Sequence, residues 1–166
     1  MSGRWGHLTA RFFDVITSRP LDRREAEEVA GWVGPGVLRD AFFTQPVADQ
    51  RHGYEAARHV LSLRPDRPDL VRAALLHDVG KRHSRLGPLG RVAASLALAA
   101  RLPLTERLAL YRDHGALAAA EMAGEAVVVV DFARHHHGER PPSIPSQDWE
   151  ILQGADRARR PSRRDR

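Results

Sequence analysis

Cysteine is absent from the 166 residues of the chain, and lysine occurs only once. Without thiols the chain can form no disulfide, and any metal must be held by histidine, aspartate or glutamate. Long apolar runs are also missing: the longest candidate, 92–100, has about half of the roughly 18 residues needed to span a membrane. The N-terminus lacks the apolar core of a secretory signal. We therefore expect a cytoplasmic protein without a membrane association.

The net positive charge of the chain is confined to its C-terminal end. The net charge is +5, and residues 157–166 carry six arginines and one aspartate, which account for all of it. Such a segment can contact nucleic acid or an anionic surface, but a solvated tail is the simpler interpretation. We expect residues 159–166 to be a basic, disordered tail, and we expect no nucleic-acid partner.

What the chain does have is a helix-forming composition, rich in Ala, Leu, Arg and Glu. Its length suits one domain with a real core. The four valines at 127–130 are ambiguous, but their neighbours favour a helix and no other segment reads as a partner strand. The sequence predicts a single all-α domain, with N-terminal helices over 1–47 that pack on a core over 48–158. The expected helices span 5–18, 22–33, 47–63, 70–80, 90–102, 105–124, 125–137 and 146–160.

The stretch LLHDVGK, residues 75–81, ends an apolar segment on an adjacent His77 and Asp78, followed by the single lysine. Imidazole and carboxylate together bind iron, manganese, nickel or zinc, and a carboxylate can bridge two ions. If the helix continues, Lys81 lies one turn beyond Asp78 on the same side, where its ammonium could neutralise a phosphate oxygen. A surface lysine near a helix C-terminus is the plain alternative. Arginine supplies every other basic side chain, which weakens that alternative.

Further ionisable residues lie in or beside apolar segments of the kind that pack inward. Buried imidazoles and carboxylates need partners, and one metal centre would satisfy all of them. Any one of these histidines alone could instead be a hydrogen-bonded core residue, a residue at a helix terminus or a solvated residue. The order along the chain is the signal, and the set comprises His52, His77, Asp78, His114, His135, His136, His137 and Asp156.

That order resembles the HD-domain superfamily of metal-dependent phosphohydrolases over roughly residues 48–158. The first fifty residues further resemble small actinobacterial HD-domain proteins. The resemblance implies a helical bundle of the HD-domain type with one or two divalent metal ions. A first ion would be held by His52, His77, Asp78 and Asp156, with His59 as a rival for the first position. A second ion would use Asp78, His114, His136 and His137, or the same set shifted by one residue to His135 and His136.

The same resemblance implies a dinuclear phosphohydrolase for a nucleotide or cyclic (di)nucleotide phosphoester, with Asp78 and Lys81 as catalytic residues. Residues 138–145, GERPPSIP, lack the Gly-Tyr-Pro segment of cyclic-di-GMP phosphodiesterases, which argues against that subgroup. Two alternatives stay open: a mononuclear nucleoside-monophosphate phosphatase with only the first four ligands, and a non-catalytic module that binds metal and nucleotide. Arg51 and His83 lie near the motifs in sequence, which is thin support for a role as general acid.

Overall fold

The computed structural model describes residues 18–100 and 102–157. Within these ranges every regular element is a helix, which confirms the all-α prediction. The helix expected over 5–18 and the tail at 159–166 lie outside the described residues, except for Ser18. The elements are α2 (Arg23–Val33), α3 (Val37–Phe43), α4 (Val47–Leu63), α5 (Pro68–Leu76), the 3₁₀ helix η1 (Val79–Ser84), α6 (Pro88–Ala99), α7 (Glu106–Arg112), α8 (His114–Glu121), α9 (Val127–His135) and α10 (Ser146–Arg157).

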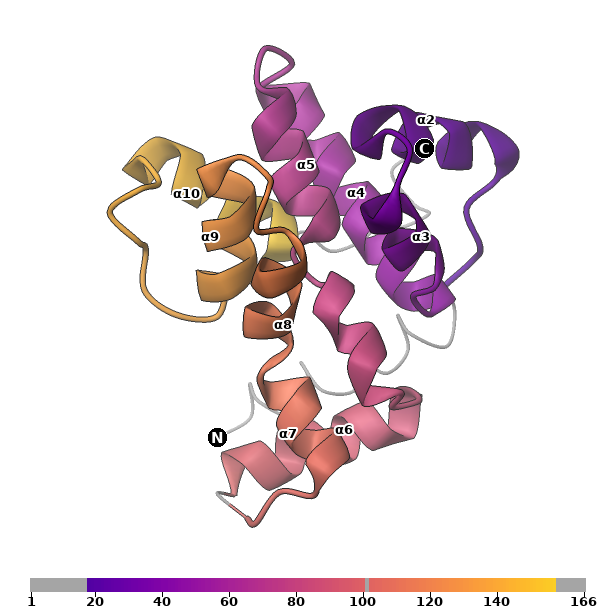
Figure 1. The fold of residues 1–166 in the computed structure, drawn as a ribbon, viewed down its shortest axis with the longest axis vertical. Helices are drawn as coiled ribbons and strands as arrows, with labels where there is room; N and C mark the ends of the chain where they lie inside the picture. Colours follow the sequence, from indigo (N-terminus) through magenta and orange to yellow (C-terminus); the bar gives the residue numbers. More distant parts are fainter. Residues whose placement is uncertain (1–17, 101, 158–166) are drawn as a thin grey trace, which may run out of the picture.

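Helices α4 and α5 form the centre of the bundle, with α9 and α10 on one side and α2 and α3 on the other (Figure 1). Six of the nine residues of α5 are buried, and Leu70, Leu75 and Leu76 are almost completely so. A helix that buries so much apolar surface belongs in a core. The His-Asp pair at the end of α5 is therefore carried into the middle of the protein.

The start of α2 follows the sequence closely. The backbone N–H of Glu25 donates to the Asp22 side chain, and the backbone N–H of Asp22 donates to Glu25. This reciprocal pair is a capping box, which satisfies two backbone donors at the helix start. The helix ends at Gly34, whose positive φ of 71° favours glycine.

The valine run at 127–130 is helical, as the sequence favours. Within α9 the buried residues are Val128, Val129, Phe132 and Ala133. Their spacing of one, three and one residues marks a single face of a helix. That face packs on α5 and α8, and it brings the histidines at the C-terminal end of α9 beside His77.

The largest differences from the predicted helix boundaries lie at the candidate ligands. α5 ends at Leu76 rather than near Gly80, and the chain continues as the 3₁₀ helix η1. The single helix expected over 105–124 is broken at Asp113 into α7 and α8, so His114 opens α8 instead of lying mid-helix. A helix continued through Asp113 would keep one axis, whereas the break lets α8 turn to pack on both η1 and α9. The sequence also did not reveal α3.

Two glycines allow the ligand-bearing elements to approach closely. A Cβ on Gly80 of η1 would lie 2.1 Å from the carbonyl oxygen of His114. A Cβ on Gly115 of α8 would lie 2.6 Å from the carbonyl oxygen of Ala133. Both obstacles are backbone atoms that cannot rotate away, so the contacts of η1 with α8 and of α8 with α9 require glycine.

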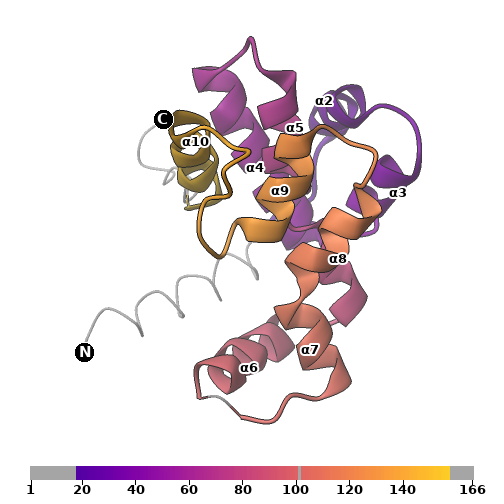
Figure 2. The ribbon, with the colours of Figure 1, turned by 60° about the vertical axis from the view of Figure 1, so that its left-hand side comes forward.

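Helices α6 and α7 form a pair at one end of the molecule, away from α2, α9 and α10 (Figures 1 and 2). α7 joins this pair to the bundle through its packing on η1. α7 has no buried residue of its own. The bundle without this pair already contains every candidate ligand.

Candidate metal centre

The fold gathers seven of the candidate ligands into two adjacent groups. The potential ligand atoms in each group lie within 4.8 Å of one another. We call Asp78, His114, His136 and His137 the inner group, and His52, His77 and Asp156 the outer group. Three of the seven residues lie on helices α4, α8 and α10, and the other four directly follow the ends of α5 and α9. Together they span more than a hundred positions of the sequence.

Asp78 lies between the two groups and turns one carboxylate oxygen toward each. Its Oδ1 atom is 3.3 Å from Nε2 of His114 and 3.5 Å from Nε2 of His136. Its Oδ2 atom is 3.5 Å from Nε2 of His77 and 3.9 Å from Nε2 of His52. This is the arrangement that a carboxylate shared by two metal ions requires.

Three buried histidines are oriented in the same way. The Nδ1 atoms of His77, His114 and His136 lie 2.6–2.8 Å from the backbone carbonyl oxygens three residues earlier. A carbonyl oxygen only accepts, so each Nδ1 carries the proton and donates it. In the neutral ring the Nε2 lone pair then points into the centre. A backbone acceptor on the far nitrogen is the usual support of a metal-binding histidine.

A bound cation would satisfy the buried acceptor atoms of the inner group. Oδ1 of Asp78 is buried and has no hydrogen-bond partner. The Nε2 atoms of His114 and His136 are 3.3 Å apart, and in neutral rings both are acceptors. One proton can be shared by only one pair of these acceptor atoms. A divalent cation can bind all three of them at once. Because buried acceptors without partners are costly, the residues fit a bound metal ion.

The outer group is more open to solvent. Oδ1 of Asp156, on α10, is 3.2 Å from Nε2 of both His52 and His77. The side chain of His52 is 32% exposed and that of Asp156 is 20% exposed, whereas His77 is fully buried. Burial alone would raise the pKa of Asp156, but its close contacts with the His52 and His77 rings hold the pKa below its usual value. Asp156 is thus an ionised ligand at the mouth of the centre.

Lys81 contacts Asp78 directly. Its ammonium donates to Oδ2, the oxygen that faces the outer group, and both side chains are buried. The side chains meet because residues three apart are aligned in a 3₁₀ helix. Burial alone would raise the pKa of Asp78, but Lys81 and His77 hold it well below its usual value. In this structure Lys81 is therefore a partner of Asp78, and it does not point freely toward a substrate.

The structure distinguishes between the neighbouring histidines that the sequence left open. His137 belongs to the inner group and His135 to neither group. The ring of His137 lies 3.9 Å from that of His136, centroid to centroid. Although the residue as a whole is exposed, partial burial of its ring and the charge of the nearby Lys81 ammonium lower the pKa of His137 to about 3. The ring is therefore neutral at pH 7 and able to bind metal.

The remaining sequence candidates have other partners. His59 is in neither group. Arg51 forms two 2.7 Å hydrogen bonds with Glu25 and also binds the backbone before α2, and His83 lies 2.5 Å from Glu121. Neither is placed as a general acid. A contact that the sequence did not reveal is that of Gln153, which donates to the carbonyl oxygen of His136 and so ties the end of α9 to α10.

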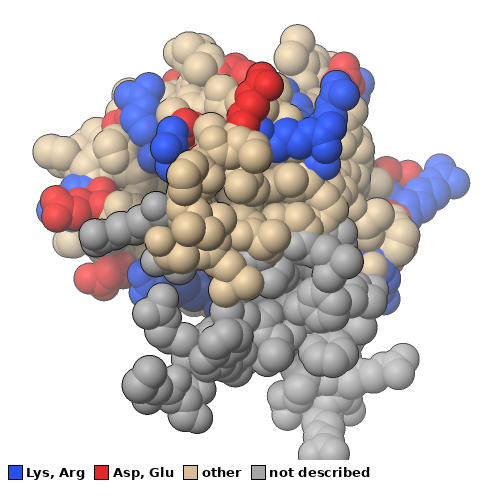
Figure 3. Space-filling model, turned by 90° about the horizontal axis from the view of Figure 1, so that it is seen from below, with Lys and Arg blue, Asp and Glu red and all other residues tan. Residues whose placement is uncertain are grey.

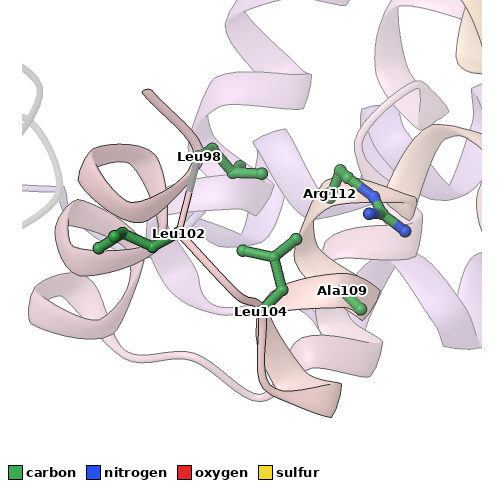
Figure 4. A pocket seen from close by; sticks show the side chains of 5 residues that line it. All are labelled: Leu98, Leu102, Leu104, Ala109 and Arg112. Carbon is green, nitrogen blue, oxygen red and sulfur yellow. The ribbon is translucent and has the colours of Figure 1, made fainter. Parts of the chain in front are cut away.

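A separate hollow of about 480 Å³ lies between α6 and α7. Leu98 comes from α6, Ala109 and Arg112 come from α7, and two leucines come from the connection between them (Figure 4). None of its lining residues belongs to the inner or the outer group. The hollow is therefore distinct from the candidate metal centre.

The described surface seen from below carries acidic and basic side chains next to one another, and they do not gather into one patch of a single sign (Figure 3). In the parts of the chain that the structure describes, no helix is both long and apolar enough to cross a membrane. Neither feature bears on the centre itself.

The fold and the site together define an all-α protein with a buried histidine and aspartate cluster that could hold metal. No family model, no curated protein and no solved structure matches the chain.

Proposed function

We propose that the protein is a dinuclear metal-dependent phosphohydrolase of the HD-domain type, with a nucleotide or cyclic (di)nucleotide phosphoester as its substrate. The observation that carries the proposal is the position of Asp78, which offers Oδ1 to the inner group and Oδ2 to the outer group. A single-ion site would need only one of these oxygens. The order of the ligands in the sequence, which resembles that superfamily, supports the same reading.

A pair of divalent ions, when bound, would supply Lewis acidity and an activated water for attack on a phosphoester. The chain's own residues do the rest. Asp78 holds the two groups together, and the backbone carbonyls behind His77, His114 and His136 fix the three rings. Solvent reaches the centre at His52 and Asp156 of the outer group and at His137 of the inner group, so a substrate would approach past these residues.

The nature of the substrate follows from charge. Metal ions and the Lys81 ammonium would form a cationic centre, which favours an anionic phosphoester over a neutral ester. The inner group favours two ions over the mononuclear alternative, because its three histidines would otherwise have no role. The non-catalytic module has no specific observation in its favour.

The test is hydrolysis of bis(4-nitrophenyl) phosphate and 4-nitrophenyl phosphate by tag-free protein with added Mn²⁺, followed by a panel of nucleotides. We expect turnover that Asp78→Asn abolishes and that His135→Ala, next to the centre but in neither group, leaves unchanged. Two bound ions without turnover of any phosphoester would contradict the proposal and favour the binding module.

A further inference from the structure

We propose that the two groups fill in a fixed order, the inner group first, and that Lys81 sets this order by occupying the outer oxygen of Asp78. The inference rests on the metal centre of the proposed function, but it concerns ion binding and not hydrolysis. Its basis is the unequal environment of the two carboxylate oxygens. Oδ1 has no hydrogen-bond partner, whereas Oδ2 accepts from the Lys81 ammonium.

The inner group is ready to bind. His114 and His136 are each 3% exposed, and their rings are already held by the carbonyl oxygens of Tyr111 and Ala133. A cation bound there would give the buried Oδ1 of Asp78 the partner that it lacks. Binding would order few side chains and would displace no internal cation, so both the entropy and the electrostatics favour this group.

At the outer group, the Lys81 ammonium competes with a metal ion for Oδ2 of Asp78. An ion that binds His52, His77 and Asp156 reaches the fourth ligand, Oδ2 of Asp78, against the positive charge of the Lys81 ammonium that Oδ2 already binds. Repulsion between the two cations favours release of the ammonium. Lys81 as a whole is 7% exposed, so release of its ammonium costs the loss of a buried, charged hydrogen bond. The second ion is therefore held more weakly than its ligand set alone would allow.

This order gives Lys81 two successive roles. While only the inner group is filled, Lys81 acts as a positioning residue that neutralises Oδ2 of Asp78. When the outer group fills, the ammonium leaves Oδ2 and becomes available to an anionic ligand at the mouth of the centre. The phosphate contact that the sequence suggests for Lys81 would thus exist only in the two-ion form.

Isothermal titration of tag-free, metal-free protein with Mn²⁺ tests the order directly. We expect two binding steps, a tight one and a weaker one. His114→Ala should remove the tight step, and His52→Ala should remove only the weak step. Loss of the tight step in His52→Ala, with its retention in His114→Ala, would overturn the inference.

Two variants of Lys81 test its part in the order. Lys81→Met keeps the length of the side chain without the charge, and we expect it to tighten the second step about tenfold or more while leaving the first unchanged. Lys81→Arg keeps a cation beside Oδ2 and should leave the second step weak. Circular dichroism checks that each variant is folded, and the Arg variant keeps the test valid if the Met variant is not. A second step equally tight in wild type, Met and Arg proteins would refute the role of Lys81.

These outcomes are independent of hydrolysis. Two ordered binding steps without turnover of any phosphoester would refute the proposed function and leave the proposed order of ion binding intact. Turnover with a reversed order of binding, or with two equal steps, would refute that order and leave the proposed function intact.

Discussion

Gly80 offers the sharpest test of the fold around the centre. A Cβ at this position would lie 2.1 Å from the carbonyl oxygen of His114 and 2.9 Å from the backbone nitrogen of Ala118. Ordinary contacts between such atoms are roughly 3.5 Å, so Gly80→Ala must push η1 and α8 apart by about 1 Å. Because the obstacles are backbone atoms, no side-chain rotation can absorb the clash.

The expected cost lies at the upper end of that for overpacked cores, about 3 kcal/mol of unfolding free energy. For a chain of this length it corresponds to a drop of roughly 6–12 °C in Tm. The same displacement would separate Oδ1 of Asp78 from Nε2 of His114, now 3.3 Å apart, so affinity for the inner ion should also fall. Urea and thermal unfolding followed by circular dichroism would measure the first effect, and calorimetric titration with Mn²⁺ the second.

The matched control is Gly31→Ala at an exposed position in the last turn of α2, where an added Cβ meets nothing within 4 Å. There alanine should stabilise the helix by about 0.5–1 kcal/mol. If Gly80→Ala unfolded within about 0.5 kcal/mol of the wild type, the close packing of η1 on α8 would be wrong, and the geometry of the centre would be wrong with it.

Three further outcomes follow from the centre and its surroundings. Asp78→Asn should remove at least one bound ion per chain, because a neutral amide is a poor bridge between two cations. Mass spectrometry of the metal content measures this loss. Two retained ions would contradict the bridging position of Asp78. His137→Ala should weaken Mn²⁺ binding in calorimetry while His135→Ala leaves it unchanged, and the reverse result would shift the inner group by one residue. The Arg51 hydrogen bonds lower the pKa of Glu25 from 4.5 to about 2. This shift adds at most about 3 kcal/mol to the free energy of unfolding, a contribution that is present above pH 4.5 and is lost as the pH falls toward 2. Urea unfolding between pH 6 and 2 should therefore show a fall in stability that Glu25→Gln largely removes, and equal slopes in both proteins would refute the pairing.

The elements that the sequence predicted well are those whose signals are local. Asp22 and Glu25 stand three residues apart at the start of α2 and form the capping box that the aspartate suggests. The buried face of α9 follows from helical spacing within nine residues. The order of His77, Asp78, His114 and the later ligands likewise lies in the sequence itself.

What the sequence could not reveal depends on contacts between distant segments. The break at Asp113 has no local proline, and it makes sense only once α8 is seen to pack on η1 and α9. The change from an α-helix to a 3₁₀ helix after Leu76 likewise has no helix-breaking residue before Gly80. The division of the two carboxylate oxygens between the groups needs coordinates, because no spacing encodes the rotation of a side chain.

The central claim is that the inner and outer groups form a two-ion centre. The most direct measurement is the metal content of tag-free protein, quantified per chain by inductively coupled plasma mass spectrometry after incubation with Mn²⁺ or Fe²⁺ and removal of the excess. The account predicts close to two first-row ions per chain. No bound metal would contradict it, because Asp78 and its histidines would then have to satisfy one another without a cation.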